Sequence, residues 1–289
     1  MIRLGGQLDI GSEKDPVKIA KMHADFGYSA SYSPEPVHDS SYIRSYREAF
    51  AAEDIVIAEI GIWKNLLAPE DDLRQANFNF ACERLAFADE LGVRCCVSWV
   101  GSLAPGVKRG PHPDNLSQRG FDLTVEAVRK LIDAVKPKRC KFGLETMQFL
   151  LPDSAEVYRE LVLAVDRKSF GVHLDPVNLI LSPRMYFNNG ALLRHCFELL
   201  GPWVVSCHAK DIILHDQNAL HLDETVPGRG NLDYATYLTE ISKLPGDTPL
   251  MMEHLKPEEY ACSRDHIVSV ARRHGIPLRQ AGIATSSIC

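Results

Sequence analysis

Four polar side chains stand at the C-terminal ends of apolar runs that are far apart in the sequence. The runs read KFGLET, GVHLDPVN, VVSCHAKD and PLMMEHL, and they carry Glu145, Asp175, His208 and Glu253. Three carboxylates and one imidazole form a ligand set for one divalent cation. The oxygen-rich set favours Mn²⁺ or Co²⁺, is compatible with Mg²⁺ or Zn²⁺, and argues against structural zinc because no cysteine belongs to it.

A cation in such a set would polarise a substrate carbonyl and make the neighbouring C–H bond more acidic. Carboxylates on two sides of the substrate can then move the proton, one as base and the other as acid. Glu145 and Glu253 are the candidates for these catalytic roles. The residues therefore point to proton transfer next to a carbonyl group.

The intervals between the four side chains indicate how a fold would bring them together. The first two intervals are each about one strand–helix–strand unit long, and the last is one unit plus a long loop. Parallel strands joined by right-handed helical crossovers have their C-terminal ends on one rim. The four side chains are therefore expected to converge at that rim.

The rest of the chain continues the same alternation of strand and helix. Strands are expected at 2–10, 28–32, 55–63, 93–100, 141–146, 171–178, 204–211 and 249–255, with helices between them and at 258–274. Two long loops, 101–115 and 212–230, interrupt the pattern. Strict alternation predicts one (β/α)8 TIM barrel domain over residues 1–289, with 275–289 as a C-terminal tail. An open doubly wound sheet would need a Gly-rich phosphate turn after the first strand, and Leu4–Gln7 does not supply it.

The amino-acid composition limits the classes of partner that the protein is expected to bind. The chain has 289 residues, is 45% hydrophobic, and carries a net charge of −6 without a block of Lys or Arg, which argues against nucleic acid as a partner. The eight cysteines form no CxxC pair, as expected for reduced thiols in a cytoplasmic protein. No signal core or membrane-length apolar run is present, so no membrane association is expected.

Several motifs are similar to those of one known superfamily and occur in its order. They are LET at 144–146, HLDPVN at 173–178, CHAKD around His208, PGRGNLDY at 227–234 and MMEHL at 251–255. In them the chain resembles the xylose-isomerase-like TIM barrels of the sugar phosphate isomerase/epimerase group, and ketose 3-epimerases in particular. The resemblance implies that Glu145 and Glu253 bind the metal and exchange the proton, whereas Asp175 and His208 bind the metal only.

The same resemblance identifies departures around the substrate. Asn178 stands where the epimerases have a substrate-binding His, and Lys210 is a candidate to replace an Arg that they carry before the Pro-Gly loop. Further candidates for substrate contact are His173, Trp63, Trp99 and Arg229; core packing is the alternative for the first three, and solvent exposure for Arg229. DNA-repair endonucleases of the superfamily need additional His and Asp ligands that this sequence does not offer.

We therefore predict a metal-dependent isomerase or epimerase of a sugar, keto-sugar or sugar acid, with proton transfer through an enediolate. A dehydratase or lyase acting on a keto-sugar or keto-inositol is the nearest alternative, because it would share the metal and the base. A sugar-binding barrel without turnover and an AP endonuclease are weaker alternatives. The predicted partner is a small carbohydrate, and the sequence is also compatible with a homo-oligomer.

Overall fold

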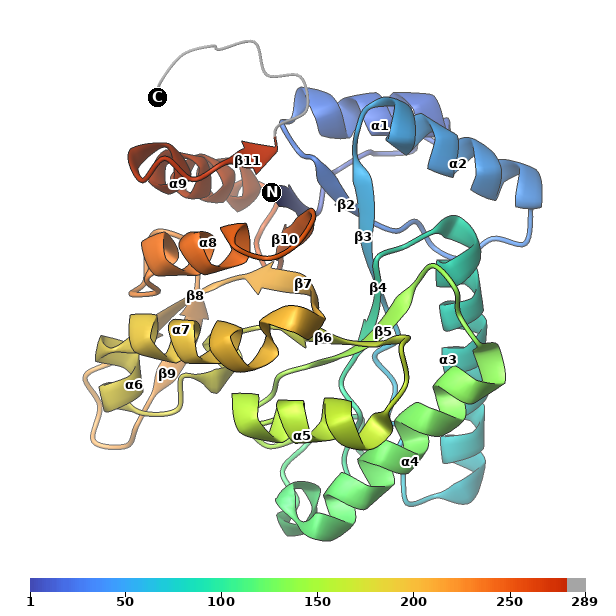
Figure 1. Cartoon of the computed structure of the whole chain (residues 1–289), viewed down its shortest axis with the longest axis vertical. Coiled ribbons are helices and arrows are strands. Elements are labelled where there is room, and N and C mark those ends of the chain that lie inside the picture. The colour runs from blue at the N-terminus through green and yellow to red at the C-terminus, as the bar shows by residue number, and fades with distance from the viewer. Residues whose placement is uncertain (280–289) are drawn as a thin grey trace.

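The computed structural model describes residues 1–279 and contains a closed barrel of eight parallel strands (Figure 1). Each strand pairs with the next along the chain, and pairing of the last strand with the first closes the barrel. The barrel strands are β1 Ile2–Gly6, β2 Ala30–Tyr32, β3 Val56–Gly61, β4 Cys95–Ser98, β5 Lys141–Glu145, β6 Phe170–Leu174, β7 Val204–Ala209 and β10 Thr248–Met252. The predicted (β/α)8 fold is confirmed.

Helices surround the barrel and connect its strands (Figure 1). Local sequence sets their ends: the Asp39 carboxylate accepts from the amides of Ser41 and Tyr42, and Gly92 ends another helix with a φ of 83° that other residues rarely adopt. The helices are α1 Pro16–Asp25, α2 Ser40–Ala52, α3 Asp71–Leu91, α4 Gln118–Val135, α5 Ala155–Val165, α6 Pro183–Phe187, α7 Asn189–Leu200, α8 Tyr234–Ser242 and α9 Glu259–Arg273.

The long loop predicted at 212–230 is partly wrong, because it contains a β-hairpin. Strands β8 (Asp211–Leu214) and β9 (Leu222–Thr225) pair antiparallel just after β7. Asp211 and Ile212 are buried at the base of the hairpin, and the Glu224 carboxylate lies 3.4 Å from the ammonium of Lys210, which directly follows β7. The hairpin therefore forms part of the wall at the barrel mouth.

Most strands are shorter than predicted, and the two largest differences lie at the ends of the first and sixth strands. The first strand ends at Gly6 rather than at residue 10, and β6 ends at Leu174. The short 3-10 helix Val177–Leu179 follows β6, because Pro176 has no N–H to continue the ladder. Asp175 consequently lies just beyond the strand, at the rim. Within the predicted tail, β11 (Leu278–Arg279) pairs with the start of β1, and residues 280–289 lie outside the described part.

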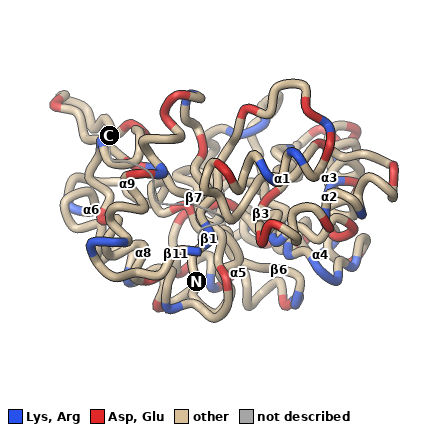
Figure 2. Tube along the Cα trace, turned by 90° about the horizontal axis from the view of Figure 1, so that it is seen from above, with Lys and Arg blue, Asp and Glu red and all other residues tan. Residues whose placement is uncertain are grey.

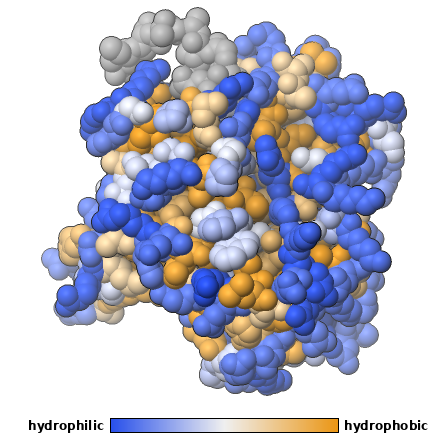
Figure 3. Space-filling view, viewed as in Figure 1, coloured by the Kyte–Doolittle hydropathy of each residue, from blue (hydrophilic) through white to orange (hydrophobic). Residues whose placement is uncertain are grey.

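Polar residues cover much of the face shown in Figure 3, with apolar patches between them. Apolar residues of the strands and helices form the buried core, including fully buried tyrosines such as Tyr158 and Tyr237. Among residues 1–279, no helix has the length and apolar character that spanning a membrane requires.

Candidate active site

The barrel brings the four predicted ligands together. Glu145 ends β5, Asp175 follows β6, His208 lies in β7, and Glu253 follows β10. One donor atom from each lies within 4.8 Å of the others, and all four residues are 9% exposed or less. Parallel strands place their C-terminal ends on one rim, which is why residues far apart in sequence meet here. The group has the composition and spacing to hold a metal ion.

Lys210 reaches into the same cluster. Its Nζ lies 2.6 Å from Glu253 Oε1, 2.8 Å from Asp175 Oδ2 and 3.7 Å from Glu145 Oε1. The side chain is 3% exposed, so the ammonium is desolvated and depends on these carboxylates. The ammonium faces these three carboxylates and also that of Glu224, at 3.4 Å, so negative charge is in excess around it and suits a further cation.

The pKa values reflect this crowding. Burial would lower the pKa of His208, but the carboxylates, with Glu253 and Glu59 foremost, raise it well above its usual range. Burial would raise the pKa of Glu253, yet His208 and Lys210 lower it to about 2. Burial likewise opposes ionisation of Asp175, and Lys210 and His208 reverse that effect, so its pKa is lowered. The carboxylates of Glu253 and Asp175 are thus held as anions.

Glu59 is a central residue that the sequence reasoning missed. It lies within β3, is 1% exposed, and places Oε2 at 3.2 Å from His208 Nε2 and Oε1 at 3.0 Å from His173 Nε2. Ser206 also donates to Glu59 Oε1. Because Nε2 of His208 faces Glu59, its Nδ1 faces the other carboxylates, at 2.8 Å from Glu253 and 3.1 Å from Glu145. A carboxylate behind the imidazole fixes the orientation of the ring.

Helix side chains fix the strand ends that carry these groups. From α8, the hydroxyl of Tyr237 donates to the carbonyl of His208 at 2.8 Å, and that of Tyr234 donates to the carbonyl of Lys210 at 2.7 Å. Thr146 donates to the Asp175 carbonyl at 2.6 Å. Each bond is buried, so it resists displacement by water. The polar groups therefore sit on a rigid frame.

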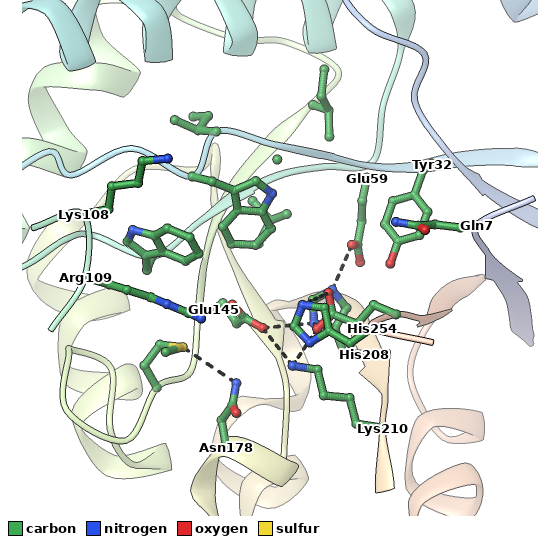
Figure 4. A pocket seen from close by; sticks show the side chains of 18 of the residues that line it. Gln7, Tyr32, Glu59, Lys108, Arg109, Glu145, Asn178, His208, Lys210 and His254 are labelled. Carbon is green, nitrogen blue, oxygen red and sulfur yellow. Dashed lines mark hydrogen bonds and ion pairs between the residues drawn. The ribbon is translucent and has the colours of Figure 1, made fainter. Parts of the chain in front are cut away.

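A cavity of about 840 Å³ opens in front of the cluster, which is ample for a monosaccharide derivative (Figure 4). Trp63 and Trp99 form one wall, with ring centroids 4.7 Å apart. The buried Nε1 of Trp99 has no hydrogen-bond partner within the described part of the chain. Gly61 makes room for the first indole, since a Cβ at that position would collide with it. Trp63 itself has a φ of 50°, and backbone strain of this kind is concentrated at functional sites.

Two cations of the long loop 101–115, Lys108 and Arg109, line the cavity. Figure 4 shows Lys108 and Arg109 on the side of the cavity opposite His254. The Arg109 guanidinium lies 5.0 Å from the centre of the Trp99 ring. Within residues 1–279 neither cation pairs with a carboxylate, whereas Arg84, also at the cavity, pairs with Glu35 at 2.8 Å. The cavity thus has a positively charged side that is free to contact a ligand.

Buried asparagines fix that loop. Asn65 Nδ2 donates to the carbonyls of Ser102 and Val107, at 2.8 and 3.0 Å. Asn115 Nδ2 donates to the carbonyl of Gly110 at 2.9 Å. These bonds hold the backbone on both sides of the two cations, so the loop keeps Lys108 and Arg109 at the edge of the cavity.

The other predicted substrate contacts have different positions. Asn178 lines the cavity, and its amide donates to Asp175 Oδ2 at 3.1 Å, so it also orients a ligand of the cluster. His173 is fully buried against Glu59 and does not line the cavity. Arg229 lies outside it, with a side chain 62% exposed and Nη1 3.6 Å from Glu259. Asp211 accepts hydrogen bonds from the amides of Gly228, Gly230 and Leu232 and so fixes the loop that follows the hairpin.

Comparisons with known proteins agree with this architecture. The sequence model of the xylose isomerase-like TIM barrel family matches residues 20–270. No curated protein matches the chain significantly in sequence.

Solved structures with the same fold span several activities. A D-psicose 3-epimerase from Clostridium cellulolyticum, solved with D-tagatose, has a TM-score of 0.66 at 17% identity and covers 95% of this chain and 99% of its own. An endonuclease IV from Thermus thermophilus has a TM-score of 0.68 at 16% identity, and the match covers 94% of this chain and 99% of the endonuclease. The 3-keto-D-glucoside 4-epimerase of E. coli has a TM-score of 0.62 at 13% identity and covers 93% and 100%. Identities this low establish a shared fold.

Proposed function

Because the chain belongs to the xylose isomerase-like TIM barrel family, we propose that it is a metal-dependent isomerase or epimerase of a sugar, keto-sugar or sugar acid. The observation that carries the proposal is the convergence of Glu145, Asp175, His208 and Glu253 within 4.8 Å at the floor of the cavity. Glu253 Oε1 already contacts one cation, the Lys210 ammonium at 2.6 Å, which supports its assignment as an oxygen that can take a metal ion. The four residues therefore fit one divalent ion, with Mn²⁺ or Co²⁺ favoured by the oxygen-rich set.

The metal, when bound, would polarise a carbonyl of the substrate. Glu145 and Glu253 are the two acids that would exchange the proton on the neighbouring carbon, one removing it and the other returning it. The indoles of Trp63 and Trp99 would pack against the carbon face of the sugar and exclude water. The buried Trp99 N–H is free to donate to a substrate hydroxyl.

Hydrogen exchange tests this proposal directly. Keto-sugars and sugar acids incubated with the Mn²⁺-loaded protein in D₂O should gain deuterium next to the carbonyl, without losing water. Elimination of a hydroxyl would support the dehydratase or lyase alternative. Tight binding without any exchange would support the sugar-binding barrel. The absence of both binding and exchange with every compound of the panel would contradict the proposal.

The two unpaired cations favour substrates with a negatively charged substituent. Replacing Arg109 with Leu should raise KM for a phosphorylated or carboxylated ketose about tenfold or more, because a charge-assisted hydrogen bond is lost. Neutral ketoses should be affected little. Steady-state kinetics on a matched charged and neutral pair measures the difference, with Arg119→Leu as the control, since Arg119 is 69% exposed and pairs with Asp114. Equal effects on both substrates would contradict an anion-binding role.

Glu59 should raise the affinity for the metal by orienting the His208 imidazole. The Glu59→Gln variant keeps the shape of the side chain but removes the anion that orients the imidazole, so metal affinity should fall about 10- to 100-fold. Competition with a chelator gives the affinity. The Ser206→Ala variant, which leaves the Glu59 carboxylate in place, should lose much less metal affinity. An unchanged affinity in Glu59→Gln would show that the buried carboxylate serves packing alone.

A phosphate-backbone substrate fits the charge distribution less well. Figure 2 shows Lys and Arg interspersed with Asp and Glu along the chain, whereas nucleic-acid-binding proteins usually carry a continuous basic surface. The cavity is lined by Glu35, Glu59, Glu145, Glu224 and Glu253. We therefore propose a small carbohydrate as the substrate, although endonuclease IV shares the fold.

A further inference from the structure

The β8–β9 hairpin carries a second group of metal-competent side chains, outside the cavity. His215 directly follows β8, His221 directly precedes β9, and Asp223 lies within β9. The His215 amide donates to the His221 carbonyl at 3.0 Å, so the ladder that pairs Leu214 with Leu222 continues to these two residues. The histidines are therefore directly opposite each other.

All three side chains lie on one face of the hairpin. Cross-strand partners point to the same side, and side chains two residues apart in a strand do so as well. His215 and His221 are thus on the same side, and Asp223 shares it. The alternation places Ile212, Leu222 and Glu224 on the other face, and these residues line a small groove against the barrel, which Asp223 also borders. The group at the hairpin tip is separate from the cluster at the barrel mouth.

The three candidate ligand atoms lie within 4.8 Å of one another, which is compatible with a shared metal ion. His215 Nε2 lies 3.0 Å and His221 Nε2 lies 3.1 Å from the same oxygen, Asp223 Oδ2. Tetrahedral Zn²⁺ with bonds of about 2.0–2.1 Å places its ligand atoms about 3.3 Å apart. Among the described residues 1–279, the buried Nε2 of His215 forms no hydrogen bond, in spite of its distance from the carboxylate. A cation between the three atoms would give this nitrogen a partner.

We propose that His215, His221 and Asp223 form a second metal site, for Zn²⁺ or a similar borderline divalent ion. Two imidazoles and one carboxylate suit Zn²⁺ far better than Mg²⁺, which prefers oxygen ligands. The side chains are 36%, 46% and 53% exposed, so an ion can enter from solvent. It would cross-link the open end of the hairpin. Glu224, the next residue, contacts Lys210 at 3.4 Å and His254 at 3.1 Å, so the ion would steady a part of the cavity wall.

Zinc stoichiometry tests the site on the full-length, chelator-stripped protein. In equilibrium dialysis against Zn²⁺ with excess Mg²⁺, His221→Ala should hold one equivalent less than the wild type. His38→Ala, which removes an exposed histidine elsewhere, should hold as much as the wild type. Equal zinc contents in His221→Ala and wild type would overturn the proposal.

A second comparison separates this site from the barrel cluster. The Asp175→Asn variant alters a proposed ligand of the cluster, and it should still lose one equivalent when His221→Ala is added. Zn²⁺ should also slow hydrogen exchange of the hairpin amides in Asp175→Asn, but not in the double variant. A His221-dependent equivalent that disappears in Asp175→Asn, or hairpin amides that do not respond to Zn²⁺, would overturn the second site while leaving the proposed function untouched.

Discussion

Replacing Glu253 with Gln should reduce the rate of hydrogen exchange into the substrate about 10²- to 10⁴-fold, the usual contribution of a positioned acid or base. The amide keeps the size of the side chain and one oxygen, but it can neither accept nor return the proton. The carboxylate of Glu253 lies 2.8 Å from His208 Nδ1, at the centre of the cluster. Quantitative exchange kinetics in D₂O, with the metal content measured on the same samples, gives the effect.

Glu258→Gln is the matched control, because Glu258 undergoes the same chemical change in an exposed position close by in sequence. It should exchange at the rate of the wild type. The metal content decides how the result is interpreted. A slow Glu253→Gln variant that still binds metal supports an acid–base role. A variant that exchanges as fast as the wild type would remove Glu253 from the mechanism.

Lys210→Met should destabilise the metal-free protein by about 3–5 kcal/mol, because it leaves buried carboxylates without their cation. Asp175 is fully buried, and Glu253 is 9% exposed, so water cannot take over the role of the ammonium. The same change should strengthen divalent-ion binding, since Lys210 and the ion both neutralise these carboxylates. Denaturant unfolding with chelator and with Mn²⁺ measures both effects.

The stability of Lys210→Met should therefore depend on Mn²⁺ far more steeply than that of the wild type. Lys256→Met serves as the control, because Lys256 is exposed and lies just before α9. If Lys210→Met were equally unstable with and without Mn²⁺, the ammonium and the ion would not share their carboxylates. The inferred competition would then be wrong.

The convergence of the four ligands could be predicted because each follows an apolar strand and parallel strands end on one rim. Glu59 could not be found in this way, since it lies inside a strand and has no turn residue beside it. Its signal was a single carboxylate within the apolar run IVIAEIGIW. A buried charge is costly unless it is paired. That run therefore implied a partner, which the structure identifies as His173 and His208.

Other features depend on tertiary contacts that the sequence does not encode locally. The positive side of the cavity exists because Asn65 and Asn115 hold the loop that carries Lys108 and Arg109. The hairpin after β7 appeared as a loop, because its strands are only four residues long. Arg229 stands between two glycines, a place that suggested reach toward a ligand, yet its guanidinium lies outside the cavity near Glu259.

Anomalous diffraction from crystals soaked in Mn²⁺ would locate the metal ion in the barrel. The proposed metal-dependent function predicts one peak within bonding distance of Glu145, Asp175, His208 and Glu253, with the Lys210 ammonium moved away from Asp175 and Glu253. Fully loaded crystals with no peak at that position, and with Lys210 still bridging the carboxylates, would contradict it.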